Sequence, residues 1–136
     1  MEESQLRAAL QELNGLLREL HRGLIAATRR EYEAAHGPIG GPYALLGLVA
    51  NDPAFAWLRP LSALIVQLDE LEEQAAIEVL QAAALRAAVA QLVLPSDPES
   101  AGALFYARLR EARDAEPSLV VTHTHVRMAL GALPQS

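Results

Sequence analysis

Leucines recur at steps of three and four along the first third of the chain, and this spacing predicts one long helix over Glu3–His36. Its expected inner face consists of Leu6, Leu10, Leu13, Leu17, Leu20, Leu24, Thr28 and Tyr32. Such a seam is typical of a helical bundle or a coiled coil. Gly15 and Gly23 either weaken this helix or let a neighbouring helix approach closely. Gly37 and Pro38 end it, because glycine suits the position just past a helix and proline cannot continue one.

The central stretch, Asp52–Glu73, predicts the helix around which the others pack. Asp52 can cap its start, and Pro53 suits its first turn. Its apolar positions keep the same spacing and carry Phe55, Leu58, Leu61, Leu64, Ile65, Leu68 and Leu71. The single tryptophan, Trp57, lies near its beginning. Pro60 either kinks this helix or starts a new one, and the unbroken apolar spacing favours a kink.

Four shorter helices are predicted between turn signals. They cover Tyr43–Ala50, Ala75–Leu92, about Pro98–Ala115 and about Ser118–Leu133. The last two are expected to bury Leu104, Phe105 and Leu109, and Leu119, Val126, Leu130 and Leu133. Glycine and proline mark three of the breaks, at Gly37–Pro42, Pro95–Pro98 and Glu116–Ser118. The break near Gln74 lacks both residues, so its position is inferred from the acidic run that precedes it.

Leu119–Val126 alone alternates like a β-strand, but a single strand would have no partner in this chain. The expected fold class is therefore all-α. We expect one domain over residues 1–136, built as an up-and-down helical bundle of four main helices plus a short extra helical segment.

The amino-acid composition narrows the range of possible functions. The net charge of −6 argues against a nucleic-acid groove or an anionic membrane surface. The chain has no cysteine, which excludes disulfides and thiolate zinc sites, and no lysine, which excludes a phosphate-loop lysine and Schiff-base chemistry. The first residues are acidic and amphipathic, unlike a signal peptide, and no apolar run reaches the roughly 20 residues of a spanning helix. We therefore expect a cytoplasmic protein without nucleic-acid or membrane partners.

Three segments together resemble a group of small bacterial helical proteins of unknown function. They are LHRGLIAATRREYEAAHGPIGGP, LLGLVANDPAFAWLRPLSALIVQLDE and FYARLREARDAEPSLVVTHTHVRMAL, and DPAFAWLRPLS is their most distinctive part. The resemblance covers most of the chain and implies a helical fold without a known activity. His21 and His123 fall at positions that match the pattern of this group, which carries no role over to them.

A metal site has weak sequence support. Glu33 and His36 form one E-x-x-H pair, whereas carboxylate-bridged di-iron bundles need two such pairs and further glutamates. The helix dipole alone explains a histidine in a last helical turn. His123 and His125 would point about 200° apart on a helix, so they cannot chelate one ion together. We expect His123 to face the core and His125 to face outward.

A buried polar site is the remaining candidate for chemistry. It would combine His21 and His123 with Asp69 or Glu73, because imidazole and carboxylate suit several metals. Ser62 could contact His123, but no nucleophile-elbow motif surrounds it. The simpler interpretation, a core histidine with a hydrogen-bond partner and a solvated acidic face, is favoured. We therefore expect no catalytic residue, no metal and no cofactor.

Two functions follow from these patterns. The favoured prediction is a non-enzymatic protein that acts through protein association, as a homodimer or with another protein, using the long leucine seam of its first helix. The alternative is a binding module that holds a metal ion or a small apolar ligand near His21, His123 and Trp57.

Overall fold

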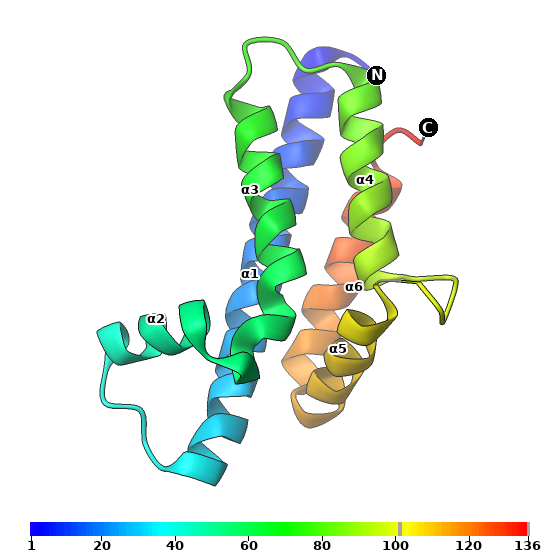
Figure 1. The fold of residues 1–136 in the computed structure, drawn as a ribbon. Coiled ribbons are helices and arrows are strands. Elements are labelled where there is room, and N and C mark those ends of the chain that lie inside the picture. Colours follow the sequence, from blue (N-terminus) through cyan, green and yellow to red (C-terminus); the bar gives the residue numbers. More distant parts are fainter. Residues whose placement is uncertain (101, 136) are drawn as a thin grey trace.

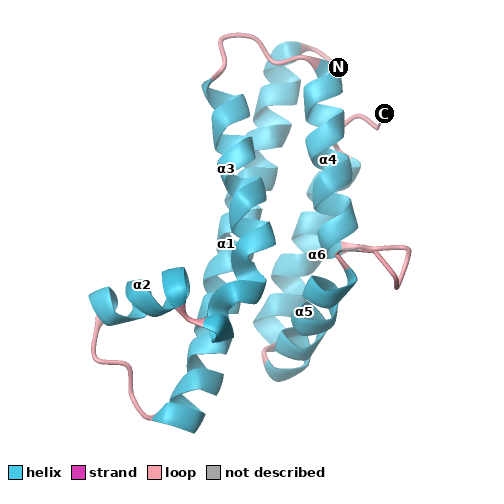
Figure 2. Cartoon of the chain, in the orientation of Figure 1, coloured by secondary structure: helices cyan, strands magenta, loops and turns pink. Residues whose placement is uncertain are grey.

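The computed structural model describes residues 1–100 and 102–135, and these residues form helices and loops without a strand (Figures 1 and 2). The elements are α1 (Glu3–His36), α2 (Pro42–Asn51), the 3-10 helix η1 (Pro53–Leu58), α3 (Arg59–Glu73), α4 (Val79–Val93), α5 (Ala103–Ala115) and α6 (Pro117–Gly131). The all-α prediction is confirmed. The strand-like stretch Leu119–Val126 lies inside α6, where Leu119 and Val126 face the core.

The first helix has the predicted bounds, because its seam fills the core without interruption. The six leucines of the seam between Leu6 and Leu24 are each at most 1% exposed, and Leu16, which lies beside the seam, is partly buried. A side chain at Gly23 would place its Cβ 2.5 Å from Cδ2 of Leu119, so this glycine lets α6 approach α1 closely. Gly15 has no such neighbour, since no described residue lies within 4 Å of the place that a Cβ would take there.

Of the two alternatives at Pro60, the favoured one, a single kinked helix, is wrong, and the other, a new helix that starts there, is correct to within one residue. The chain forms the separate 3-10 helix η1, and α3 begins at Arg59 with Pro60 in its first turn. Asp52 caps η1 as predicted, since its Oδ1 accepts a hydrogen bond of 2.9 Å from the Ala54 N–H. A 3-10 helix aligns residues three apart, and this brings both Phe55 and Leu58 into the core.

The predicted start of the fourth helix is also wrong, because residues 74–78 form a loop and α4 begins at Val79. The first turns of α1 hold this loop. Arg7 donates hydrogen bonds of 2.7 Å to the Glu72 carbonyl and 2.9 Å to the Gln74 carbonyl. Glu3 Oε1 accepts one of 3.0 Å from the Ile77 N–H. These contacts join residues far apart in the sequence, so local pattern could not reveal them.

The fifth helix begins at Ala103, five residues later than expected, and its inner face is narrower. Leu104 is 82% exposed, so the prediction that it is buried is wrong. Phe105 and Leu109 are buried as expected. Adjacent residues on a helix point about 100° apart, and Phe105 takes the inward position. The last helix ends at Gly131, two residues early, although Leu133 is still buried.

The long helices lie side by side, with α1 packed against α3 and α6, and α3 packed against α4 (Figure 1). The short helix α2 projects sideways near the far end of α1, and it packs mainly on η1. The described residues therefore form six α-helices, of which α2 stands outside the main group.

Candidate functional site

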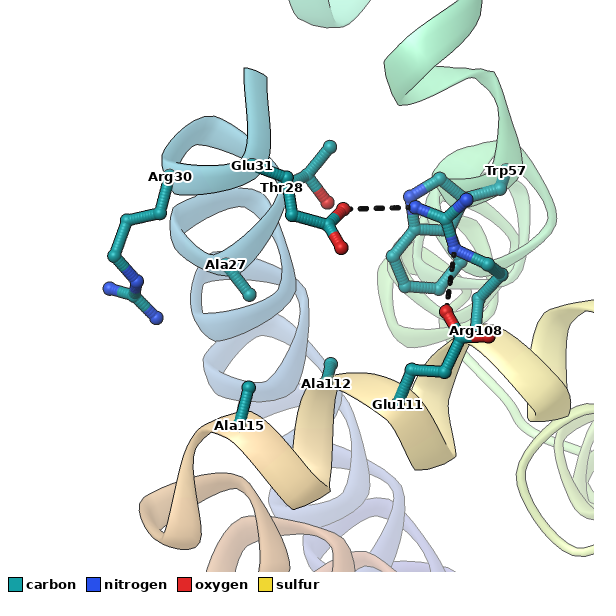
Figure 3. A pocket seen from close by; sticks show the side chains of 9 residues that line it. All are labelled: Ala27, Thr28, Arg30, Glu31, Trp57, Arg108, Glu111, Ala112 and Ala115. Atoms are coloured by element: carbon teal, nitrogen blue, oxygen red, sulfur yellow. Dashed lines mark hydrogen bonds and ion pairs between the residues drawn. The ribbon is translucent and has the colours of Figure 1, made fainter. Parts of the chain in front are cut away.

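Trp57 lies at the junction of three elements. Its side chain extends from η1 into the space between α1 and α5 (Figure 3). The ring lies beneath the Arg108 guanidinium, whose Cζ is 5.2 Å from the ring centroid, and it packs against Phe105 with centroids 5.3 Å apart. Arg108 Nη2 donates a hydrogen bond of 3.2 Å to Glu31 Oε2, and its Nε lies 3.7 Å from Glu111 Oε2. The two carboxylates hold the cation over the indole.

Two small cavities flank this arrangement. One of about 130 Å³ lies between Trp57, Thr28 of α1 and Ala112 of α5 (Figure 3). The other, of about 280 Å³, lies between Trp57, Tyr32 and Pro53. The Trp57 Nε1 atom is buried and has no hydrogen-bond partner among the described residues. Buried indole N–H groups usually have a partner, so this unpartnered donor is unusual.

His21 and Ser62 are brought together between α1 and α3. His21 Nε2 lies 2.8 Å from Ser62 Oγ, and Ser62 Oγ donates a hydrogen bond of 3.3 Å to the Leu58 carbonyl. This chain of bonds assigns the proton to His21 Nε2, which donates to the serine. Burial lowers the pKa of His21, and the adjacent Arg18 guanidinium lowers that pKa further.

Asp69 lies about two turns beyond Ser62 on α3 and forms a separate polar cluster with α1. It forms an ion pair with Arg18, and its Oδ1 accepts a hydrogen bond of 2.7 Å from Asn14 Nδ2. Asn14 Nδ2 also donates to Glu72 Oε2 at 2.6 Å. The hydrogen bond from Arg18, followed by that from Asn14, lowers the pKa of Asp69. Glu73, the alternative acidic candidate, is exposed on α3.

His123 lies in a different environment, where α4, α5 and α6 meet. It is 1% exposed, as predicted, whereas His125 is exposed. Its Nε2 donates a hydrogen bond of 2.8 Å to the Val93 carbonyl, and its Nδ1 accepts one of 2.8 Å from Arg113 Nη1. Both ring nitrogens are therefore occupied. Burial lowers the pKa of His123, and the nearby Arg113 charge lowers that pKa further.

The candidate combination of His21 and His123 with Asp69 or Glu73, which was not the favoured interpretation, is not assembled, and His123 bonds to Arg113 rather than to Ser62. Within residues 1–100 and 102–135, no three His, Asp or Glu side chains lie close enough to share a metal ion.

The E-x-x-H pair at the end of α1 has structural contacts. Glu33 accepts hydrogen bonds of 3.1 Å from Arg29 Nε and 3.0 Å from the Ile39 N–H. The bond from Ile39 is the main reason that the pKa of Glu33 is lowered. His36 stacks on Tyr32 with centroids 4.3 Å apart. Glu33 thus anchors the Gly37–Pro42 connection by occupying a backbone donor that could otherwise bind an anion.

The surface of α2 is a second candidate. Tyr43 and Leu46 are 90% and 64% exposed, and with Gly47 and Ala50 they form one outward stripe at helical spacing. All ten residues of α2 are described, and none of them is buried. No helix within the described residues is long and apolar enough to cross a bilayer.

The sequence analysis did not identify several residues that take part in these sites. Asn14, Arg108 and Arg113 acquire their roles through partners on other helices, so no local pattern marks them. The α2 surface did have a signal, because Gly37–Asn51 contains no charged residue in a chain that is 21% charged.

Comparisons of the chain with protein-family models, with curated proteins and with solved structures found no match. The resemblance to small bacterial helical proteins therefore stays a prediction.

Proposed function

We propose that this chain is a non-enzymatic protein-association module that forms a homodimer through the outward stripe of α2. The observation that carries this proposal is that α2 is apolar and uncharged, yet none of its ten described residues is buried. A monomer gains little from holding such a helix in water, whereas a partner would cover Tyr43 and Leu46.

The absence of charge on α2 permits a second copy of the chain as the partner. Two chains that each carry a net charge of −6 repel one another over most orientations. Two α2 helices can meet without placing like charges opposite one another, because Gly37–Asn51 is uncharged. Gly47 and Ala50 on the same stripe would let the two backbones approach closely.

The long seam of α1 is not available for this purpose. Its leucines are already buried against the chain's own helices, so the predicted association through α1 is replaced by association through α2. We further propose that α1, α3, α4 and α6 serve as an up-and-down four-helix framework that holds α2 outside. The packing of α1 against α3 and α6, and of α3 against α4, supports this.

Light scattering at micromolar concentration tests the proposal. The wild-type chain should have twice the mass of one chain, and Leu46→Glu should have the mass of a single chain while its circular dichroism stays helical. Leu104→Glu is the matched control, because Leu104 is an exposed leucine on another helix. It should remain dimeric. A monomeric wild type, or equal dissociation by both substitutions, would contradict the proposal.

The cavity beside Trp57 supports a second candidate function, the binding of a small apolar molecule. The smaller cavity, about 130 Å³, is close to the roughly 150 Å³ that admits benzene in an engineered protein. Titration with a ligand of that size, such as benzaldehyde, should quench Trp57 fluorescence in a saturable way. Substituting Ala112 by Leu, which fills the cavity, should abolish saturation, and unsaturable quenching would remove this candidate.

A further inference from the structure

A polar cavity lies between α1 and α3, away from both α2 and Trp57. Its volume is about 190 Å³, and its lining is Arg18, His21, Arg22, Ser62 and Ile65. Four of these five side chains carry a hydrogen-bond donor, and two of them are guanidinium groups. The cavity is therefore rich in donors although the chain as a whole is acidic.

The helix spacing explains why these donors converge. His21 and Arg22 lie three and four residues after Arg18, so both lie beside Arg18 on the surface of α1. Ser62 faces them from α3, and its 2.8 Å contact with His21 Nε2 joins the two helices at the cavity. His21 and Ser62 are thus fixed between two packed helices, while the Arg18 and Arg22 side chains beside them are exposed.

The charges in this cavity are incompletely balanced. Arg18 is paired with Asp69, which also accepts a hydrogen bond from Asn14. Arg22 has no ion pair with any described residue. Within the described part of the chain, the cavity thus retains one unpaired guanidinium beside a histidine and a hydroxyl.

We propose that this cavity binds a small oxyanion of the phosphate class, held by the guanidinium groups of Arg22 and Arg18 beside the His21 imidazole. Guanidinium groups match phosphate oxygens in geometry and form charge-assisted hydrogen bonds with them. The ion can be free phosphate or the phosphate of a small monoester, since both present the same oxygens. The net charge of −6 opposes any anion, so binding should weaken as the ionic strength rises.

NMR titration of the histidine rings provides a site-specific test. The pKa of His21 would be measured in chloride and in inorganic phosphate at equal ionic strength. The bound oxyanion favours the charged imidazole, so the pKa of His21 should rise in phosphate, whereas the ring signals of the exposed His125 should not respond to the choice of anion. Glycerol phosphate in a third arm distinguishes the sources: tighter binding than inorganic phosphate indicates a monoester, and equal or weaker binding indicates the free ion.

Arg22→Gln should weaken phosphate binding about tenfold or more, because it removes a charge-assisted hydrogen bond. Arg127→Gln is the matched control, since it removes an exposed arginine from α6 and should leave binding unchanged. The inference is overturned if phosphate leaves the pKa of His21 unchanged. Equal responses of His21 and His125, or equal responses of the two arginine variants, would overturn it as well.

Discussion

The helices α1 and α2 are both rich in leucine, yet one face of α1 is buried in the core and none of the described residues of α2 is buried. Eight residues of α1 are buried, whereas no residue of α2 is, although the structure describes both helices completely. In α1 the apolar side chains form one stripe and charged residues cover the opposite side. In α2 the apolar residues lie all around a ten-residue helix, so one side must face outward. A continuous stripe, rather than leucine content, places a helix in this core.

The largest expected effect comes from truncating one leucine in each helix. Leu17→Ala in α1 should lower the free energy of unfolding by about 2–5 kcal/mol, because it leaves a cavity in the core. Leu46→Ala in α2 should change it by less than about 0.5 kcal/mol, as surface substitutions usually do. Urea denaturation, at protein concentrations too low for dimerisation, measures the free energy of unfolding of both variants. Similar losses in the two variants would mean that α2 is part of the core.

Burial of polar groups gives a second, smaller contrast, between His123 and His125 of α6. The lowered pKa of His123 means that the unfolded chain binds this proton more readily than the folded chain does. The contribution of the neutral His123 to the free energy of unfolding is therefore fully present above the ordinary histidine pKa of 6.5. This contribution falls as the pH decreases below that value. Urea denaturation from pH 7.5 to 5 should show this loss, to which His21, with its own lowered pKa, also contributes.

His123→Gln should flatten this pH dependence without abolishing it, because glutamine keeps a donor and an acceptor but does not titrate. At pH 7.5 this variant should be about 1–3 kcal/mol less stable, since its amide cannot reproduce both hydrogen bonds. His125→Gln should keep the wild-type profile. An unaltered profile in His123→Gln would show that other groups cause the loss.

The smallest effects are expected from the glycines of the two helices. In the single chain, at concentrations too low for dimerisation, Gly47→Ala should stabilise α2 by up to about 1 kcal/mol, because outside its chain neighbours and the backbone of α2 no described atom lies within 4 Å of the added Cβ. Gly23→Ala gains the same helix propensity in α1 but forces the buried Leu119 to move, at about 1–3 kcal/mol. The midpoint temperature of thermal unfolding should therefore rise for Gly47→Ala and fall for Gly23→Ala. A gain in both would mean that Leu119 can move without loss.

The sequence predicted long elements well and junctions poorly. The bounds of α1 follow from a seam that continues along most of the helix, and its end follows from Gly37 and Pro38. The apolar spacing through Pro60 looked continuous because a 3-10 turn and an α-helix both place residues three apart on one side. Leu104 was wrongly assigned to the core, since the pattern alone could not decide which of two adjacent apolar residues faces inward.

The candidate sites were predicted less completely than the fold. His21 and Ser62 were recognised individually, and burial of His123 was correct, but their partners were not foreseen. A side chain such as Arg113 can reach several neighbours, and packing of α5 against α6 decides which of them it meets. The partners of buried polar groups depend on helix packing, which a single helix pattern does not contain.

The hydrogen bonds that Glu3 and Arg7 form with the loop before α4 couple the local unfolding of this loop to that of the first turn of α1. The Ile77 amide is bonded to the Glu3 carboxylate, so its hydrogen cannot exchange with solvent while the first turn of α1 is intact. Exchange at Ile77 should therefore follow the fraying of a helix that begins 74 positions earlier in the chain. The beginning of α1 and the loop after α3 then open as one cooperative unit, although the chain between them stays folded.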